Sequence, residues 1–129
     1  MIVDTSAILA ILNDEPERRQ FNEAIEASDE CLMSTASFVE VSLVLEATRG
    51  YEGLRDLDLL LAKAGVEFVP VDLEQAQIAR KAFRIFGKGR HMAKLNFGDC
   101  FSYALAIATN SPLLFKGNDF PQTDVIQAI

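Results

Sequence analysis

The feature that most constrains the fold is a set of short, uninterrupted apolar runs separated by helical segments. Such runs occupy residues 1–4, 31–34, 66–71 and 112–115, and a weaker one occupies residues 124–126. Strands that are apolar throughout are typical of a parallel sheet buried on both faces, and alternation with helices also favours parallel pairing. We therefore expect an α/β fold with three layers, α/β/α, around a central parallel sheet of four to five strands.

The expected helices differ in how their apolar residues are spaced. Residues 17–27 and 72–86 carry one apolar stripe among charges, which predicts surface helices, with Pro16 at the first helical position of the earlier one. Residues 98–109 are rich in small side chains suited to close packing on a sheet. Helices are also expected at 6–12, 35–49 and 53–65, with Gly50 ending the second of these. Because segment 35–49 carries apolar residues on more than one face of the expected helix, we expect that helix to be buried.

The 129 residues suit a single domain, 1–129, and contain no repeat or linker. No apolar run is long enough to cross a bilayer, and the first residues do not have the pattern of a signal peptide. Cys31 and Cys100 are far apart in sequence, which favours buried, reduced thiols. These features predict a soluble, cytoplasmic protein.

The formal net charge of −7 argues against direct contact with nucleic acid phosphates, but the charge is unevenly distributed. Residues 75–98 contain no carboxylate and include half of the basic residues: Arg80, Lys81, Arg84, Lys88, Arg90 and Lys94, together with the only histidine, His91. One interpretation is a solvated helix face followed by a basic loop. The other is a phosphate-contacting patch, for which Arg84, Lys88, Arg90, His91 and Lys94 are the candidate RNA-binding residues.

Four carboxylates fall where the carboxyl ends of the strands are expected. Asp4 ends the first apolar run, Asp119 follows the fourth, and Glu40 and Asp99 lie early in helices. Ligands of open parallel sheets bind at that edge, so we expect the four carboxylates to converge there.

Each carboxylate also has a purely structural interpretation. Asp4 is a plausible helix cap, and Ser37-x-x-Glu40 has the spelling of a capping box. Asp99 fits the third position of a helix whose N-cap is Asn96, and Asp119 is a residue type common in turns. The four are more informative together, because crowded carboxylates repel one another unless a cation binds between them.

A divalent cation removes that repulsion. Carboxylate oxygens suit Mg²⁺ or Mn²⁺, which retain water molecules and bind substrate phosphate. Such ions activate water for in-line attack at phosphorus, so the chemistry needs no histidine or cysteine nucleophile. The arrangement predicts a metal-dependent phosphodiesterase.

Four blocks of the sequence resemble a PIN domain of the VapC toxin type. They are Met-Ile-Val-Asp4-Thr5-Ser6-Ala7, Glu40 early in its helix, Leu95-Asn96-Phe97-Gly98-Asp99-Cys100, and Phe115-Lys116-Gly117-Asn118-Asp119-Phe120. Their order and spacing match the family over essentially the whole chain, and the last two blocks are the more specific ones.

The resemblance implies a Mg²⁺- or Mn²⁺-dependent endoribonuclease with a PIN-like fold, inhibited by a cognate VapB-type antitoxin. Asp4, Glu40, Asp99 and Asp119 match the family's acidic quartet. Asp4 and Asp99 would ligate the metal directly, Glu40 would orient or activate a metal-bound water, and Asp119 would ligate a second ion or act through water. Ser6 matches a hydroxyl that hydrogen-bonds within the cluster. The resemblance further implies a homodimer that reaches DNA only through the antitoxin.

Two alternatives are weaker on sequence grounds, and a third remains open. A phosphoryl-transfer enzyme of the haloacid dehalogenase type needs an aspartate two residues after Asp4, where Ser6 stands. A non-catalytic PIN-like scaffold would not need an intact acidic quartet. A PIN nuclease of RNA processing, acting without an antitoxin, remains open.

Overall fold

The computed structural model describes residues 1–129 and contains one four-stranded sheet in the order β3-β2-β1-β4. The strands are β1 (Ile2–Val3), β2 (Leu32–Ser34), β3 (Glu67–Val69) and β4 (Leu113–Leu114), and all neighbouring pairs are parallel. β1 is central, with Ile2 opposite both Leu32 of β2 and Leu113 of β4.

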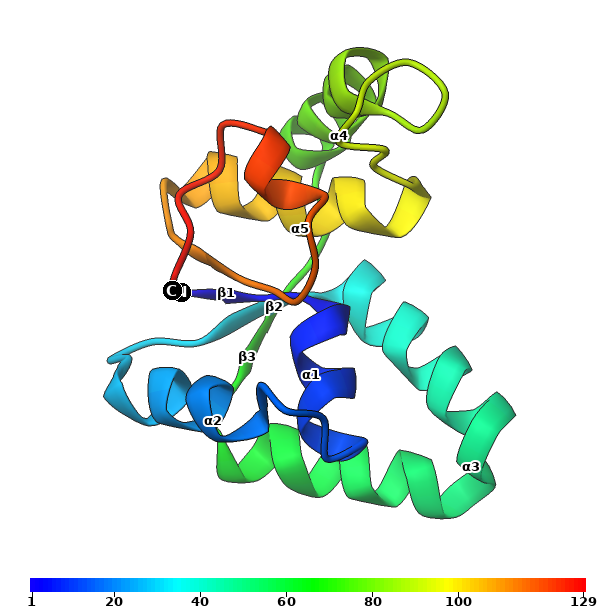
Figure 1. The fold of residues 1–129 in the computed structure, drawn as a ribbon, viewed down its shortest axis with the longest axis vertical. Helices are drawn as coiled ribbons and strands as arrows, with labels where there is room; N and C mark the ends of the chain where they lie inside the picture. Colours follow the sequence, from blue (N-terminus) through cyan, green and yellow to red (C-terminus); the bar gives the residue numbers. More distant parts are fainter.

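Helices cover both faces of the sheet (Figure 1). One face carries α1 (Thr5–Leu12), α2 (Arg18–Ala27) and α3 (Thr35–Lys63), and the other carries α4 (Leu73–Phe86) and α5 (Phe97–Thr109). Successive strand residues enter separate cores: Val3 belongs to the cluster with α1–α3, and Ile2 to the cluster with α4 and α5. Both side chains are fully buried. The predicted three-layer fold is therefore confirmed.

Gly50 bends α3 in its middle, and Figure 1 shows this elbow as the part of the helix that lies farthest from the sheet. Its backbone has φ 61° and ψ −149°, a conformation that glycine adopts easily because it lacks Cβ. Beside the bend, Arg49 pairs with Asp56 and donates a 3.3 Å hydrogen bond to the Leu12 carbonyl. The predicted interruption between residues 49 and 53 is thus present, and Arg49 ties the elbow to α1.

The expectation that the first half of α3 is buried all round is wrong. Val41 and Leu45 are fully buried, whereas Val39 and Leu43 are 53% and 62% exposed. The segment packs on α1 along one side and extends away from the short strands of the sheet, so its outer side has no neighbour within the chain (Figure 1). An apolar face is therefore left open to solvent.

Two further expectations need adjustment. Pro16 lies two residues before α2 begins at Arg18, with Glu17 at the cap position, so it is not the first helical residue. The segment 124–126 is not a strand; only an isolated bridge joins Leu113 to Gln127. Cys31 and Cys100 are free and buried, as expected. None of the helices combines the length and apolar character needed to cross a membrane.

Candidate active site

Asp4 is the most firmly held of the four carboxylates. It directly follows β1, caps α1 and is only 2% exposed. Its Oδ2 accepts hydrogen bonds from the Ser6 amide (3.0 Å) and the Ser6 hydroxyl (2.6 Å), and its Oδ1 accepts one from the Ser102 hydroxyl (2.5 Å). The capping interpretation is therefore correct for Asp4, and it explains how a buried carboxylate is fixed at the sheet edge.

Two buried serines complete this network: Ser37, which the sequence suggested only as a helix cap, and Ser102, which the sequence did not suggest at all. The Ser37 and Ser102 hydroxyls lie 3.1 Å apart, and the Thr5 hydroxyl donates to the Ser37 carbonyl at 3.3 Å. Ser102 follows Asp99 by three residues, so both side chains lie on one side of α5. That spacing is the signal in the sequence that identifies Ser102.

Asp99 lies in the first turn of α5 and closes a capping box with Asn96. The Asp99 amide donates to the Asn96 side chain at 2.9 Å, and Oδ2 of Asp99 accepts from the Asn96 amide at 3.0 Å. Burial, with additional repulsion from Asp4, Glu40 and Asp119, raises the pKa of Asp99 to about 6 despite the lowering effect of the Asn96 amide. The charges of the other three candidate carboxylates therefore all act on Asp99.

Glu40 projects from α3 against the start of α5. A Cβ placed on Gly98 would lie 1.7 Å from Oε2 of Glu40, so the absence of a side chain at Gly98 makes room for this carboxylate. Burial raises the pKa of Glu40, the nearby Thr5 hydroxyl opposes the rise, and Asp4 adds to it. The capping-box interpretation of Glu40 is wrong, because α3 begins at Thr35 with Ser34 as its cap.

Asp119 is exposed and lies where the chain after β4 enters a short 3-10 helix, with no side-chain hydrogen bond as a cap. The same loop is tied to the site by the Lys116 amide, which donates to the Ser6 hydroxyl at 2.9 Å. The Lys116 ammonium group pairs instead with Glu15 (2.9 Å) and Glu17 (3.2 Å). None of the chain's ion pairs involves a carboxylate of the quartet.

The donor set is that of a site for a hard cation. It offers carboxylate and hydroxyl oxygens, has no paired lysine or arginine, and includes Asp99, whose pKa is raised by burial and further by three other carboxylates. Mg²⁺ is typically bound by one or two carboxylates while it keeps several waters. As the side chains stand, no three or more His, Cys, Asp or Glu residues are arranged to hold an ion by themselves.

The candidate RNA-binding residues lie on other segments of the chain than the quartet. Arg84 is on α4, and Lys88, Arg90, His91 and Lys94 are in the loop between α4 and α5. The four cations are exposed and form no ion pair. His91 has a structural role, because its Nδ1 accepts a 3.0 Å hydrogen bond from the Ala93 amide and its ring packs edge-on against Phe86 at 5.2 Å.

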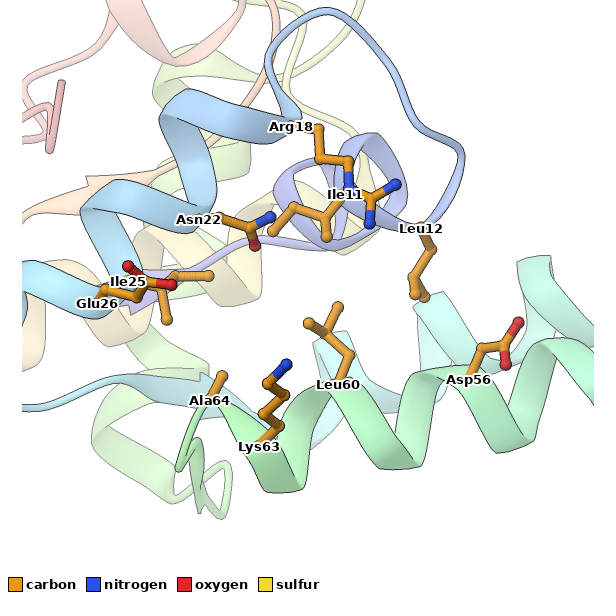
Figure 2. A pocket seen from close by; sticks show the side chains of 10 residues that line it. All are labelled: Ile11, Leu12, Arg18, Asn22, Ile25, Glu26, Asp56, Leu60, Lys63 and Ala64. Atoms are coloured by element: carbon orange, nitrogen blue, oxygen red, sulfur yellow. The ribbon is translucent and has the colours of Figure 1, made fainter.

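A hollow of about 410 Å³ lies between α1, α2 and the second half of α3 (Figure 2). Leu60 of α3 points toward Ile11 and Leu12 of α1, and Arg18 and Asn22 approach from α2. None of the four carboxylates lines this hollow, so it is separate from the candidate active site.

Comparison with known proteins identifies the family that the sequence blocks resemble. The model of a family described as "PIN domain" matches residues 1–126. Ribonuclease VapC30 of Mycobacterium tuberculosis is 54% identical over 125 residues, which cover 97% of this chain and 95% of that protein.

Two solved structures resemble the fold. VapC20 of Mycobacterium tuberculosis, described as a "Sarcin-Ricin loop cleaving toxin", aligns with a TM-score of 0.79 at 15% identity and covers 98% of this chain and 96% of its own. A chain of VapBC2 from Rickettsia felis, solved with a DNA fragment from their promoter, has a TM-score of 0.73 at 15% identity, covering 98% and 95%. At these identities the likeness concerns the fold alone.

Proposed function

We propose that this chain, which belongs to the PIN-domain family and within it to the VapC ribonucleases, cleaves RNA with divalent metal ions held by its four clustered carboxylates. The proposal treats residues 1–129 as a single PIN domain. The observation that carries it is the gathering of Asp4, Glu40 and Asp119 around Asp99 with no quartet carboxylate in an ion pair; burial, and then repulsion from the other three, raise the pKa of Asp99 to about 6. A site of this kind is stabilised by bound Mg²⁺ or Mn²⁺.

In this proposal Asp4 and Asp99 are the direct metal ligands, and Asp119 approaches from the exposed loop after β4. When bound, the ions neutralise the carboxylates, bind the substrate phosphate and promote attack by water at phosphorus. Ser6 and Ser102 hold both oxygens of Asp4 in place, which limits the rearrangement needed on binding. Glu40, which is half-buried and has a raised pKa, would orient or activate the attacking water.

The test compares RNA cleavage by purified wild type, Asp4→Asn and Asp99→Asn, with exposed Asp58→Asn as the matched control. We expect cleavage to require Mg²⁺ or Mn²⁺, to stop with EDTA and to fall by more than about 100-fold in the two site variants. Asp58→Asn should cleave at the wild-type rate. Equal rates for wild type and Asp99→Asn, after removal of contaminating nuclease, would refute the assignment.

We also propose a VapB-type antitoxin as the partner that inhibits this site. Support comes from the fold shared with the VapBC2 chain, whose complex also holds promoter DNA. With a net charge of −7, this chain would reach DNA only through that partner. Co-expression with the product of the adjacent reading frame should yield a complex that no longer cleaves RNA. If no neighbouring product inhibits cleavage, a PIN nuclease of RNA processing is the better description.

The exposed apolar face of α3 supports a homodimer. Val39, Leu43 and Val44 form a strip along the first half of the helix that nothing in the chain covers. Burying such a strip against a second copy removes apolar surface from water. We place the dimer in the cytoplasm, where its RNA substrate is present and its two free cysteines stay reduced.

A further inference from the structure

An aromatic pocket lies between α4 and α5, beside the candidate active site. It has a volume of about 400 Å³, and its lining includes Arg80 and Phe83 of α4 and Phe97 and Phe101 of α5. Phe97 and Phe101 pack edge to face with their ring centroids 4.9 Å apart. Phe97 is nevertheless 78% exposed, so most of its ring has no partner within the chain.

The pocket and the carboxylates share the first turns of α5 but use different sides of the helix. Phe97 and Phe101 are four residues apart and lie on the side that faces α4. Asp99 and Ser102 are three residues apart and lie on the side that faces Asp4. A helix with its side chains is only ~10–12 Å wide. A single nucleic acid strand that crosses the start of α5 can therefore contact both the pocket and the carboxylates.

Unpaired cations lie next to the pocket, on α4 and in the loop that follows it. Arg80 also lines a second hollow on α4, together with Gln77, Lys81 and Arg84. The guanidinium of Arg90 lies 5.9 Å from the centre of the Phe83 ring. All ion pairs of the chain involve other basic residues, so these four cations have no acidic partner.

This combination has the chemistry of a single-stranded RNA site. Such sites pair a positively charged track for the phosphates with aromatic side chains on which unpaired bases stack. A protein partner fits less well, because lysine is depleted at protein interfaces, although phenylalanine and arginine are common there, and Lys81 lines the α4 hollow with Arg80 and Arg84.

We propose that Phe97, backed by Phe101, stacks on an unpaired base of the RNA substrate next to the phosphate held at the carboxylates, while Arg80, Lys81 and Arg84 contact the adjoining phosphates. This inference rests on the proposed function, because it assumes that RNA passes over the start of α5. It assigns the aromatic contact to base binding and the α4 cations to backbone binding.

The test measures binding by fluorescence anisotropy in EDTA, so that the probe is not cleaved. The probes are a labelled oligoadenylate of roughly 12 nucleotides and an abasic oligomer of the same length. We expect Phe97→Ala to weaken oligoadenylate binding about 5- to 150-fold and to leave abasic binding unchanged. Phe97→Trp should restore the preference for bases, and Tyr51→Ala, which removes an exposed aromatic ring at the α3 elbow, should change neither probe.

The phosphate contacts have their own readout. Replacing Arg80 and Arg84 with alanine should weaken the binding of both probes to the same extent and reduce the dependence of binding on salt concentration. The inference would be overturned if wild type bound both probes equally, or if Phe97→Ala lost affinity equally for both. It would also be overturned if Phe97→Ala changed the oligomeric state, because the pocket would then be a protein interface.

The outcomes also separate this inference from the proposed function. If wild type cleaves RNA with Mg²⁺ or Mn²⁺ and Phe97→Ala binds and cleaves equally well, only the pocket assignment fails. If binding depends on the bases but wild type cleaves no RNA, the pocket assignment stands and the nuclease proposal fails.

Discussion

The hydroxyl of Ser102 donates a 2.5 Å hydrogen bond to Oδ1 of Asp4, joining residues 98 positions apart. Both residues are buried, with 1% and 2% of their surface exposed. The contact links the end of β1 to the middle of α5 and satisfies an oxygen that the capping interaction with Ser6 leaves free. The candidate site is thus held together by a bond between the two sides of the sheet.

Ser102→Ala should destabilise the protein, because it leaves a buried carboxylate oxygen without a donor. The expected loss is about 1–3 kcal/mol in the free energy of unfolding, measured by urea denaturation in metal-free buffer. Ser111→Ala, which removes only a hydroxyl bonded to the Thr109 carbonyl, should change stability by less than about 0.5 kcal/mol. Similar values for the two variants would mean that Asp4 finds another donor.

The stability of the metal-free protein should depend on pH through Asp99. Its pKa is raised from 3.8 to about 6, so folding favours the protonated form. The stabilising contribution of Asp99 is complete below its unfolded pKa and is lost as the pH rises through about 6. Wild type should therefore lose stability relative to Asp99→Asn between about pH 4 and pH 7 in urea unfolding with EDTA. Parallel pH curves would contradict the raised pKa.

Gly98→Ala should reduce activity with little loss of stability. The new methyl group would overlap the carboxylate of Glu40, the flexible end of its side chain, which can move away. We expect cleavage to fall by more than ~10-fold, with stability changed by less than ~1 kcal/mol, since alanine is the better helix former.

The role of Glu40 in that effect is tested by a double-mutant cycle. If Gly98→Ala acts by displacing Glu40, it should add almost no further loss in a Glu40→Gln background. Additive losses would show that Gly98 affects cleavage by another route.

Leu43→Asp should convert a dimer into a monomer, because it places a charge on the exposed strip of α3. Light scattering coupled to size-exclusion chromatography gives the mass directly. Leu59→Asp is a matched control, since Leu59 is 63% exposed, against 62% for Leu43, but lies beyond the elbow. A dimeric Leu43→Asp would place the dimer interface on another surface.

The sequence by itself determined the features that depend on local spacing. Apolar runs without alternation predicted a parallel sheet buried on both faces. Ile2 and Val3 of β1 are indeed buried on opposite sides of it, but the edge strand β3 is largely exposed, with Phe68 45% accessible. The Asn96-x-x-Asp99 spacing predicted the cap of α5, since both partners lie within one helical turn. The four carboxylates were identified by their position after strands or at helix starts.

Only the tertiary structure decided which of several local interpretations applies. Ser37-x-x-Glu40 has the same spelling as a capping box, but α3 begins two residues before Ser37, and Glu40 is free to meet Gly98. The apolar residues around α3 predicted burial, yet Leu43 is exposed because no other element covers that side. Spacing along the chain specifies what a helix can bury or bond, and the packing of distant segments decides what it meets. The bond between Asp4 and Ser102 depends on that packing.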